Sequence, residues 1–120
     1  MLDPRHEKRI SLVQDVFAKS FYEDQKHDNS KAEAVWKAKD ELDTIISKHA
    51  PRYPIEKISS VDLSILRCCI YELLYNKDVP VKVVMNEAVT MAKELSGERS
   101  YAFVNAILGA FYNDQLKEKK

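Results

Sequence analysis

The hydrophobic positions of this chain are most concentrated between residues 59 and 75, in the stretch SSVDLSILRCCIYELLY. Apolar residues fall on nearly every side of a helix drawn through it, which is typical of a buried helix. Its length of about 25 Å and its charged residues Asp62, Arg67 and Glu72 argue against a membrane span. Ser59 and Asp62, three residues apart, predict a capping box at its start. We therefore predict a buried central helix that other helices surround.

The N-terminal half shows the helical spacing of apolar residues twice. The first helix is predicted from residue 4 to about residue 24, with a stripe of Ile10, Val13, Val16, Phe17 and Phe21. Residues 28–30 form a polar break with N-cap character. The second helix is predicted from residue 31 to about residue 49, before two prolines. The pattern therefore places two helices in front of the central one.

Two more helices are predicted after the central helix. Pro80 suits the first turn of the next helix, and Gly97 is expected as its left-handed C-cap. Ser100 can cap the last helix, and Gly109 inside that helix indicates a close helix crossing. The prediction is an all-α fold: a single domain over residues 1–120, a compact bundle of about five helices packed around the central buried helix.

Composition narrows the class of protein. The chain has 120 residues, of which 45% are hydrophobic and 32% charged, as in one soluble globular domain. Two Gly and four Pro supply too few turns for an all-β fold. The N-terminus lacks the basic start and apolar run of a signal peptide. Cys68 and Cys69 are adjacent on the buried helix, so we expect reduced core thiols and a cytoplasmic protein.

The charge pattern is the first functional signal. Formal net charge is zero, which argues against strong nonspecific binding of nucleic acid. Basic residues are nevertheless in excess at both ends of the chain: Arg5, Lys8 and Arg9 at the start, and Lys117, Lys119 and Lys120 at the end. Each cluster is either a solvated terminus or a surface for a polyanion.

Catalytic and metal sites find no support in the sequence. His6, His27 and His49 lie far apart, and none is spaced with a cysteine or carboxylate as a metal pair would be. Two glycines cannot form a phosphate-binding loop, and no serine or cysteine has a base near it in sequence. We therefore predict a protein that is not an enzyme and has no metal or cofactor.

Polar residues on apolar helices leave two interpretations open. Asn86, Glu87, Asn105 and Arg67 either tie helices together, with Arg67 and Glu87 as the expected charge pair, or form a surface for a partner.

The second half of the chain carries a family resemblance. The segments VDLSILRCCIYELLY, DVPVKVVMNEAV, AKELSGERS and FVNAIL follow one another between residues 58 and 111. They resemble the NusB family of transcription antitermination factors. RHEKRISLVQDVF resembles the family's opening arginine-rich helix and keeps Arg5 and Arg9. The family usually has three helices in its N-terminal half, so the two predicted here would be a shortened version.

The resemblance implies an RNA-binding protein that pairs with the ribosomal protein acting as NusE. The pair would hold boxA-type single-stranded RNA and help RNA polymerase read through terminators, notably in ribosomal RNA operons. The RNA-binding residues would be Arg5, Lys8, Arg9, Arg99 and Phe103, and the partner-binding residue would be Asp62. Phe103 is equally a core residue by periodicity. The alternative is a NusB-like RNA-targeting or protein-docking accessory module without antitermination activity.

Overall fold

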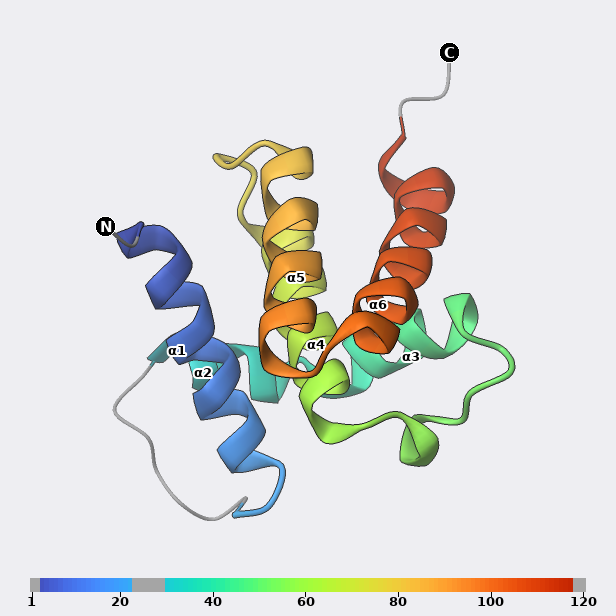
Figure 1. Ribbon diagram of the computed structural model, residues 1–120, viewed down its shortest axis with the longest axis horizontal. Coiled ribbons are helices and arrows are strands. Elements are labelled where there is room, and N and C mark those ends of the chain that lie inside the picture. The colour runs from blue at the N-terminus through green and yellow to red at the C-terminus, as the bar shows by residue number, and fades with distance from the viewer. Residues whose placement is uncertain (1–2, 23–29, 118–120) are drawn as a thin grey trace.

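A central helix, α4 (Ser60–Tyr75), organises the structure, a computed structural model that describes residues 3–22 and 30–117. Within these residues α4 contacts each of the other five α-helices. They are α1 (Pro4–Lys19), α2 (Ser30–Lys37), α3 (Lys39–His49), α5 (Val81–Leu95) and α6 (Glu98–Phe111). Figure 1 shows α4 behind α5, with α1 and α6 on either side. The predicted all-α bundle around a buried helix is confirmed.

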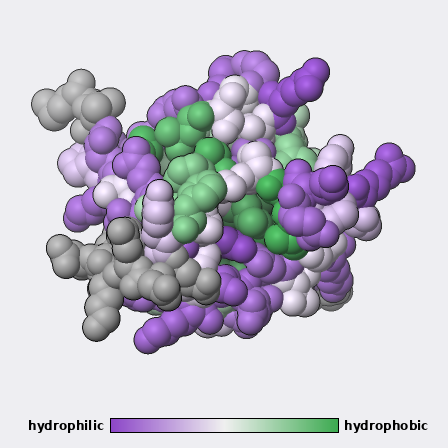
Figure 2. All heavy atoms as spheres, turned by 90° about the horizontal axis from the view of Figure 1, so that it is seen from below, coloured by the Kyte–Doolittle hydropathy of each residue, from purple (hydrophilic) through white to green (hydrophobic). Residues whose placement is uncertain are grey.

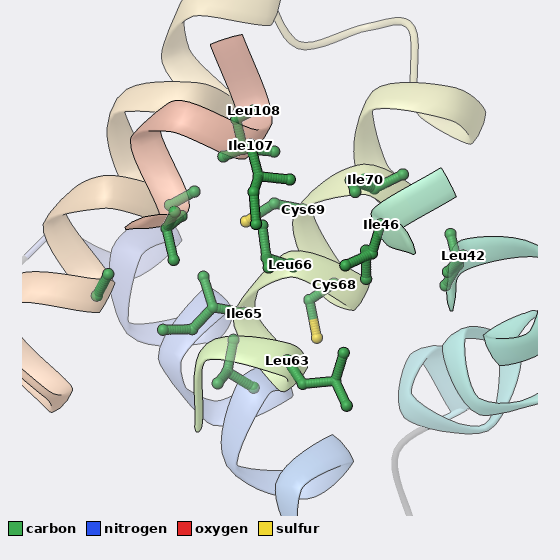
Figure 3. Close-up of a cluster of buried hydrophobic side chains, with 14 of the residues drawn as sticks. Leu42, Ile46, Leu63, Ile65, Leu66, Cys68, Cys69, Ile70, Ile107 and Leu108 are labelled. Carbon is green, nitrogen blue, oxygen red and sulfur yellow. The ribbon is translucent and has the colours of Figure 1, made fainter. Parts of the chain in front are cut away.

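The core is built on the all-round apolar surface of α4. Every residue from Asp62 to Ile70 is buried, and Ile65, Leu66 and Ile70 have no exposed surface. Side chains of α3 and α6 pack against them, as Figure 3 shows for Ile46 and Leu108. Cys68 and Cys69 are free thiols within this core, and burial raises the pKa of both. A thiol with a raised pKa stays protonated at neutral pH, and a protonated thiol is a poor nucleophile.

The described residues of the N-terminal half form three helices, so the prediction of two is wrong. The predicted helix over residues 31–49 divides at Ala38, whose φ and ψ are −91° and 5°. The Ala38 N–H is shared between the carbonyl oxygens of Ala34 (3.2 Å) and Val35 (3.1 Å). No Gly or Pro marks the break, so the apolar period gave no sign of it.

The ends of the first two helices also differ from the prediction. Helix α1 ends at Lys19, and Phe21 of the predicted apolar stripe is 58% exposed. Ser30 is the first residue of α2 rather than its cap. Residues 24, 28 and 29, to which the other predicted boundaries were assigned, lie outside the described residues.

Three expectations for the C-terminal helices are corrected. Gly97 has a positive φ of 124°, but its ψ of −167° is not that of a left-handed helical cap, and it precedes α6 as the N-cap. Ser100 therefore lies in the first turn of α6 instead of capping it. Gly109 marks no close crossing, because a Cβ atom added there would have no heavy atom within 4 Å. Pro80 stands directly before α5, at its N-cap.

The expected pair of Arg67 with Glu87 is also wrong. Arg67 donates from Nε and Nη2 to the two carboxylate oxygens of Asp43, each at 2.8 Å, and so joins α4 to α3. Glu87 faces α1, where it meets His6 and Arg9. Asn86 and Asn105 are exposed. Periodicity showed which positions lie near the core, but not which neighbouring helix each polar group faces.

Candidate nucleic-acid interface

A groove of about 1270 Å³ lies between α1, α2 and α4 and contains the basic cluster of the N-terminus. We call it the α1–α4 groove; the lining residues that matter below are Arg5, Lys8, Arg9, Tyr71, Glu72 and Tyr75. Arg5 and Lys8 are exposed, and the Arg5 side chain retains 83% of its surface. The Arg5 Nε lies 3.4 Å from Asp3 Oδ1, an exposed pair of the kind that holds a side chain only weakly. Both cations can therefore meet an anion in the groove.

Arg9 has a different role from its two basic neighbours. Its Nε and Nη2 donate to the two oxygens of Glu72 at 3.0 and 2.7 Å, and its Nη1 lies 3.5 Å from Glu87. These bonds raise the pKa of Arg9, the Glu72 hydrogen bonds being the largest cause. Only 13% of its side chain is exposed. Arg9 thus fixes α1 against α4 and α5, and Arg5 and Lys8 carry the outward charge.

His6 provides a second attachment of α1 to α5. Its Nδ1 bonds Glu87, and its Nε2 lies 3.2 Å from Glu94. The hydrogen bond with Glu87 is the main reason that the pKa of His6 is raised above 6.5. This carboxylate pair was not anticipated from the sequence.

Two tyrosines form the aromatic wall of the groove. The rings of Tyr71 and Tyr75 lie 4.8 Å apart with an interplanar angle of 45°, and Tyr75 is 55% exposed. The Tyr75 hydroxyl donates to Glu41 Oε1 at 2.6 Å, which raises the pKa of the phenol. Sequence reasoning missed this feature, although the i, i+4 spacing of YELLY places both rings on one face of a helix.

The other predicted site residues meet in a separate pocket of about 530 Å³ at the start of α4. Asp62, Arg99 and Phe103 all line it, together with Tyr53, Lys57 and Ser100. We call it the Asp62 pocket. Figure 2 looks onto the end of the molecule where the chain enters α4 and shows apolar surface among polar side chains. One residue assigned to the partner and two assigned to RNA therefore share a pocket, whereas Arg5, Lys8 and Arg9 lie in the α1–α4 groove.

Asp62 connects the starts of two helices in this pocket. Its N–H donates to Ser59 Oγ at 3.2 Å, as the predicted capping box requires. Its Oδ2 accepts from Ser100 Oγ at 3.1 Å, so the carboxylate reaches α6 rather than completing the box. The position in the first turn of α4 favours a negative charge.

Phe103 and Tyr53 form the aromatic side of the pocket. Their ring centroids lie 5.1 Å apart at 81°, an edge-to-face contact. Phe103 is half-buried and packs on the core, whereas Tyr53 is 51% exposed. The two interpretations of Phe103 are compatible, since the residue packs against the core and also lines the pocket.

The described part of the chain contains neither a cluster suited to a metal ion nor a membrane-spanning helix. Residues 3–22 and 30–117 contain no group of three or more His, Cys, Asp or Glu side chains that could hold a metal ion. No helix in the same ranges has the length and apolarity needed to cross a bilayer.

The fold, the α1–α4 groove and the Asp62 pocket define a small protein, all-helical in its described residues, whose surface combines cations with aromatic rings. Residues 5–113 match the model of the NusB family, and the chain belongs to that family. The resemblance found in the sequence is therefore confirmed.

Curated relatives agree with this assignment. The transcription antitermination protein NusB of Clostridium botulinum (strain Loch Maree / Type A3) is 48% identical over 73 residues, which are 61% of this chain and 52% of the relative. The protein of that name from Bacillus pumilus is 41% identical over 85 residues, 71% of this chain and 64% of the relative. The first match thus spans about half the length of the relative.

Solved structures share the fold. T. maritima NusB superposes with a TM-score of 0.81 at 28% identity, covering 95% of this chain and 94% of the other. A chain from the crystal structure of a plectonemic RNA supercoil gives a TM-score of 0.84 over 98% of this chain and 100% of the other. Its identity of 18% supports the fold alone.

Proposed function

We propose that this protein is a transcription antitermination factor that binds single-stranded RNA in the α1–α4 groove. The observation that carries the proposal is that exposed Arg5 and Lys8 line the same groove as the exposed ring of Tyr75, in a member of the NusB family. Cations neutralise phosphates, and an aromatic face stacks an unpaired base. A single strand offers both of these groups, whereas a paired duplex hides its base faces.

A protein partner completes the proposal. The chain has zero formal net charge, so long-range attraction for RNA is small. A basic ribosomal protein, the one that acts as NusE, would add cations and fix the path of the strand. The RNA would be the boxA-type element and the process read-through by RNA polymerase, notably in ribosomal RNA operons. We expect binding by the pair to exceed the sum of its parts.

The test measures affinity for a labelled boxA-like oligonucleotide by fluorescence anisotropy across a salt series. Replacing Arg5 and Lys8 together by Gln should weaken binding and flatten the slope of log K against log salt by about 1.4, since each phosphate contact on a single strand contributes about 0.7. Arg9 is left intact because its charge is held by Glu72. An unchanged slope in the double variant would remove RNA from this groove.

A matched control removes the same charge elsewhere. Lys37 and Lys82 are exposed and line neither hollow, so replacing both by Gln should leave the slope near that of the unmodified protein. A read-through assay with purified polymerase then separates the alternative function. A chain that binds RNA normally yet gives no read-through with its partner is an accessory module rather than an antitermination factor.

A further inference from the structure

The imidazole ring of His6 lies between two carboxylates of α5. Its Nδ1 bonds Glu87, and its Nε2 lies 3.2 Å from Glu94 Oε2. An ionised carboxylate only accepts hydrogen bonds, so both ring nitrogens must carry a proton for both bonds to form. Both nitrogens are protonated only in the charged imidazolium. The contacts between α1 and α5, which lie side by side in Figure 1, therefore include a bond pair that depends on the charge of His6.

His6 belongs to a cluster of five charged side chains where α1 meets α4 and α5. We call it the His6 cluster; its members are His6, Arg9, Glu72, Glu87 and Glu94. Arg9 lies 2.7 Å from Glu72 and 3.5 Å from Glu87, and His6 meets Glu87 and Glu94. Two cations thus face three carboxylates. One negative charge is in excess while His6 is protonated, and the loss of its proton leaves two.

Other charged groups stand near the first turn of α1, but none of them titrates near neutral pH. They are Asp3, Arg5, Glu7 and Lys8 of α1 and Lys31 of α2. Glu33 of α2 pairs with Lys19 at the far end of α1, 2.7 Å away. Among these described side chains and the His6 cluster, the imidazole is the one whose ordinary pKa lies near neutrality. The charge of this region therefore changes near neutral pH through His6.

The His6 cluster borders the α1–α4 groove. Arg9 and Glu72 belong to the cluster and line the groove together with Arg5 and Lys8. His6 directly follows Arg5 and comes two residues before Lys8 in the same turn. A phosphate held by these two cations therefore lies close to the cluster, and an added negative charge there repels it. In water, one unit charge about 7 Å from a phosphate changes the affinity about threefold.

We propose that His6 is a positioning residue that makes RNA binding in the α1–α4 groove sensitive to pH. Protonated His6 holds the first turn of α1 on Glu87 and Glu94 and offsets their negative charge, and neutral His6 does neither. This inference rests on the proposed RNA-binding function and adds its regulation. Because protonation favours the RNA-bound state, RNA binding favours protonation by the same factor. The affinity for RNA therefore falls as pH rises through the pKa of His6.

The experiment measures binding of a uridine heptamer with a pH-insensitive fluorescent label to the full chain, by anisotropy at constant low salt. From about pH 6 to 8.5, we expect the affinity of the unmodified protein to fall about threefold. His6→Gln is neutral throughout, and should bind weakly at every pH. His6→Arg is charged throughout and keeps donors for both carboxylates, so it should bind tightly at every pH.

Two further variants separate this histidine from the rest of the protein. Glu94→Gln removes one of the two carboxylates that favour the imidazolium, and should move the midpoint of the pH response to lower pH. His49→Gln is the matched control, because His49 bonds Asp114 and lines neither the α1–α4 groove nor the Asp62 pocket. It should leave the pH response intact. Circular dichroism at each pH verifies that every variant is folded.

The inference is overturned if the affinity of the unmodified protein does not change over this pH range. A pH response that survives in His6→Gln would overturn it too, since another group, such as the α-amino group, would then be responsible. In both cases, weaker binding by the variant lacking Arg5 and Lys8 would leave the proposed function standing. Absence of RNA binding at every pH, with the partner present as well, would remove both proposals.

Discussion

Removing the carboxylate of Asp43 tests the structure most directly, because it leaves Arg67 buried without its partner. Arg67 is 6% exposed, and both of its hydrogen bonds to Asp43 are 2.8 Å long. Breaking a buried ion pair from one side costs about 3–5 kcal/mol. The Asp43 side chain is 21% exposed, so water relieves part of the cost and we expect about 3 kcal/mol for Asp43→Ala.

Urea unfolding measures this loss with a local and a global signal. Trp36 is the single tryptophan, and its ring lies 5.4 Å from the Arg67 guanidinium, so fluorescence reports on the site itself. Far-UV circular dichroism reports on all helices, and coincident transitions indicate two-state unfolding. With a slope of about 1–3 kcal/mol per molar urea, a loss of 3 kcal/mol lowers the midpoint by about 1–3 M.

A double-mutant cycle identifies the partner of Arg67. Arg67→Met combined with Asp43→Ala should show a coupling energy of about 2–3 kcal/mol, whereas Arg67→Met with Glu87→Gln should show nearly none. The exposed pair of Lys93 and Glu98, 3.3 Å apart, serves as the surface control and should couple by no more than about 0.5 kcal/mol. A larger coupling with Glu87 than with Asp43 would refute the helix arrangement described above.

Further predictions concern three single positions. The pKa of His6 is raised because protonated His6 bonds Glu87 and Glu94, so protonated His6 stabilises the folded state. This contribution is fully present below about pH 6.5, the pKa of an unfolded histidine, and is lost as pH rises through the higher pKa of the folded state. Between about pH 5.5 and 8.5, His6→Gln should therefore lose less stability than the unmodified protein, and parallel curves of urea midpoint against pH would contradict the contacts with Glu87 and Glu94. Gly97→Ala should destabilise by about 1–3 kcal/mol because of the positive φ. Gly109→Ala should instead stabilise by about 0.5–1 kcal/mol, since nothing lies near its added methyl group. Thermal unfolding checks both glycines: the melting temperature should fall for Gly97→Ala and rise for Gly109→Ala.

The sequence predicts those features of the fold that depend only on residues close together in the chain, such as the apolar pattern of one helix. The burial of α4 followed from apolar residues on all its sides, which no surface helix carries. The break at Ala38 could not be predicted, because neither composition nor period changes there. The partner of Arg67 was missed for a related reason: a helical wheel shows that a charge points inward, but not which helix it meets.

The candidate sites were predicted in part. The basic cluster of α1 was visible in sequence, but the bonds that hold Arg9 to Glu72 depend on how α1 packs on α4. The meeting of Asp62 with Arg99 follows from topology. Two short connections reverse the chain after α4 and again after α5, so α4 and α6 begin at the same end of the bundle. The topology does not show that Asp62 and Arg99 line the same pocket, because this depends on how far each helix is shifted along its neighbour.

The attachment of Arg9 has a consequence for how this protein responds to polyanions. Three cations stand in the first turns of α1, yet one of them has its charge neutralised inside the molecule. The effective valence of α1 toward a nucleic acid is therefore two, lower than a count of basic residues gives. Because the pair of Arg9 and Glu72 is mostly shielded from solvent, added salt screens it less than it screens Arg5 and Lys8. If α1 binds RNA as proposed, we therefore expect added salt to weaken the contacts of Arg5 and Lys8 with RNA more than it weakens the attachment of α1 to α4.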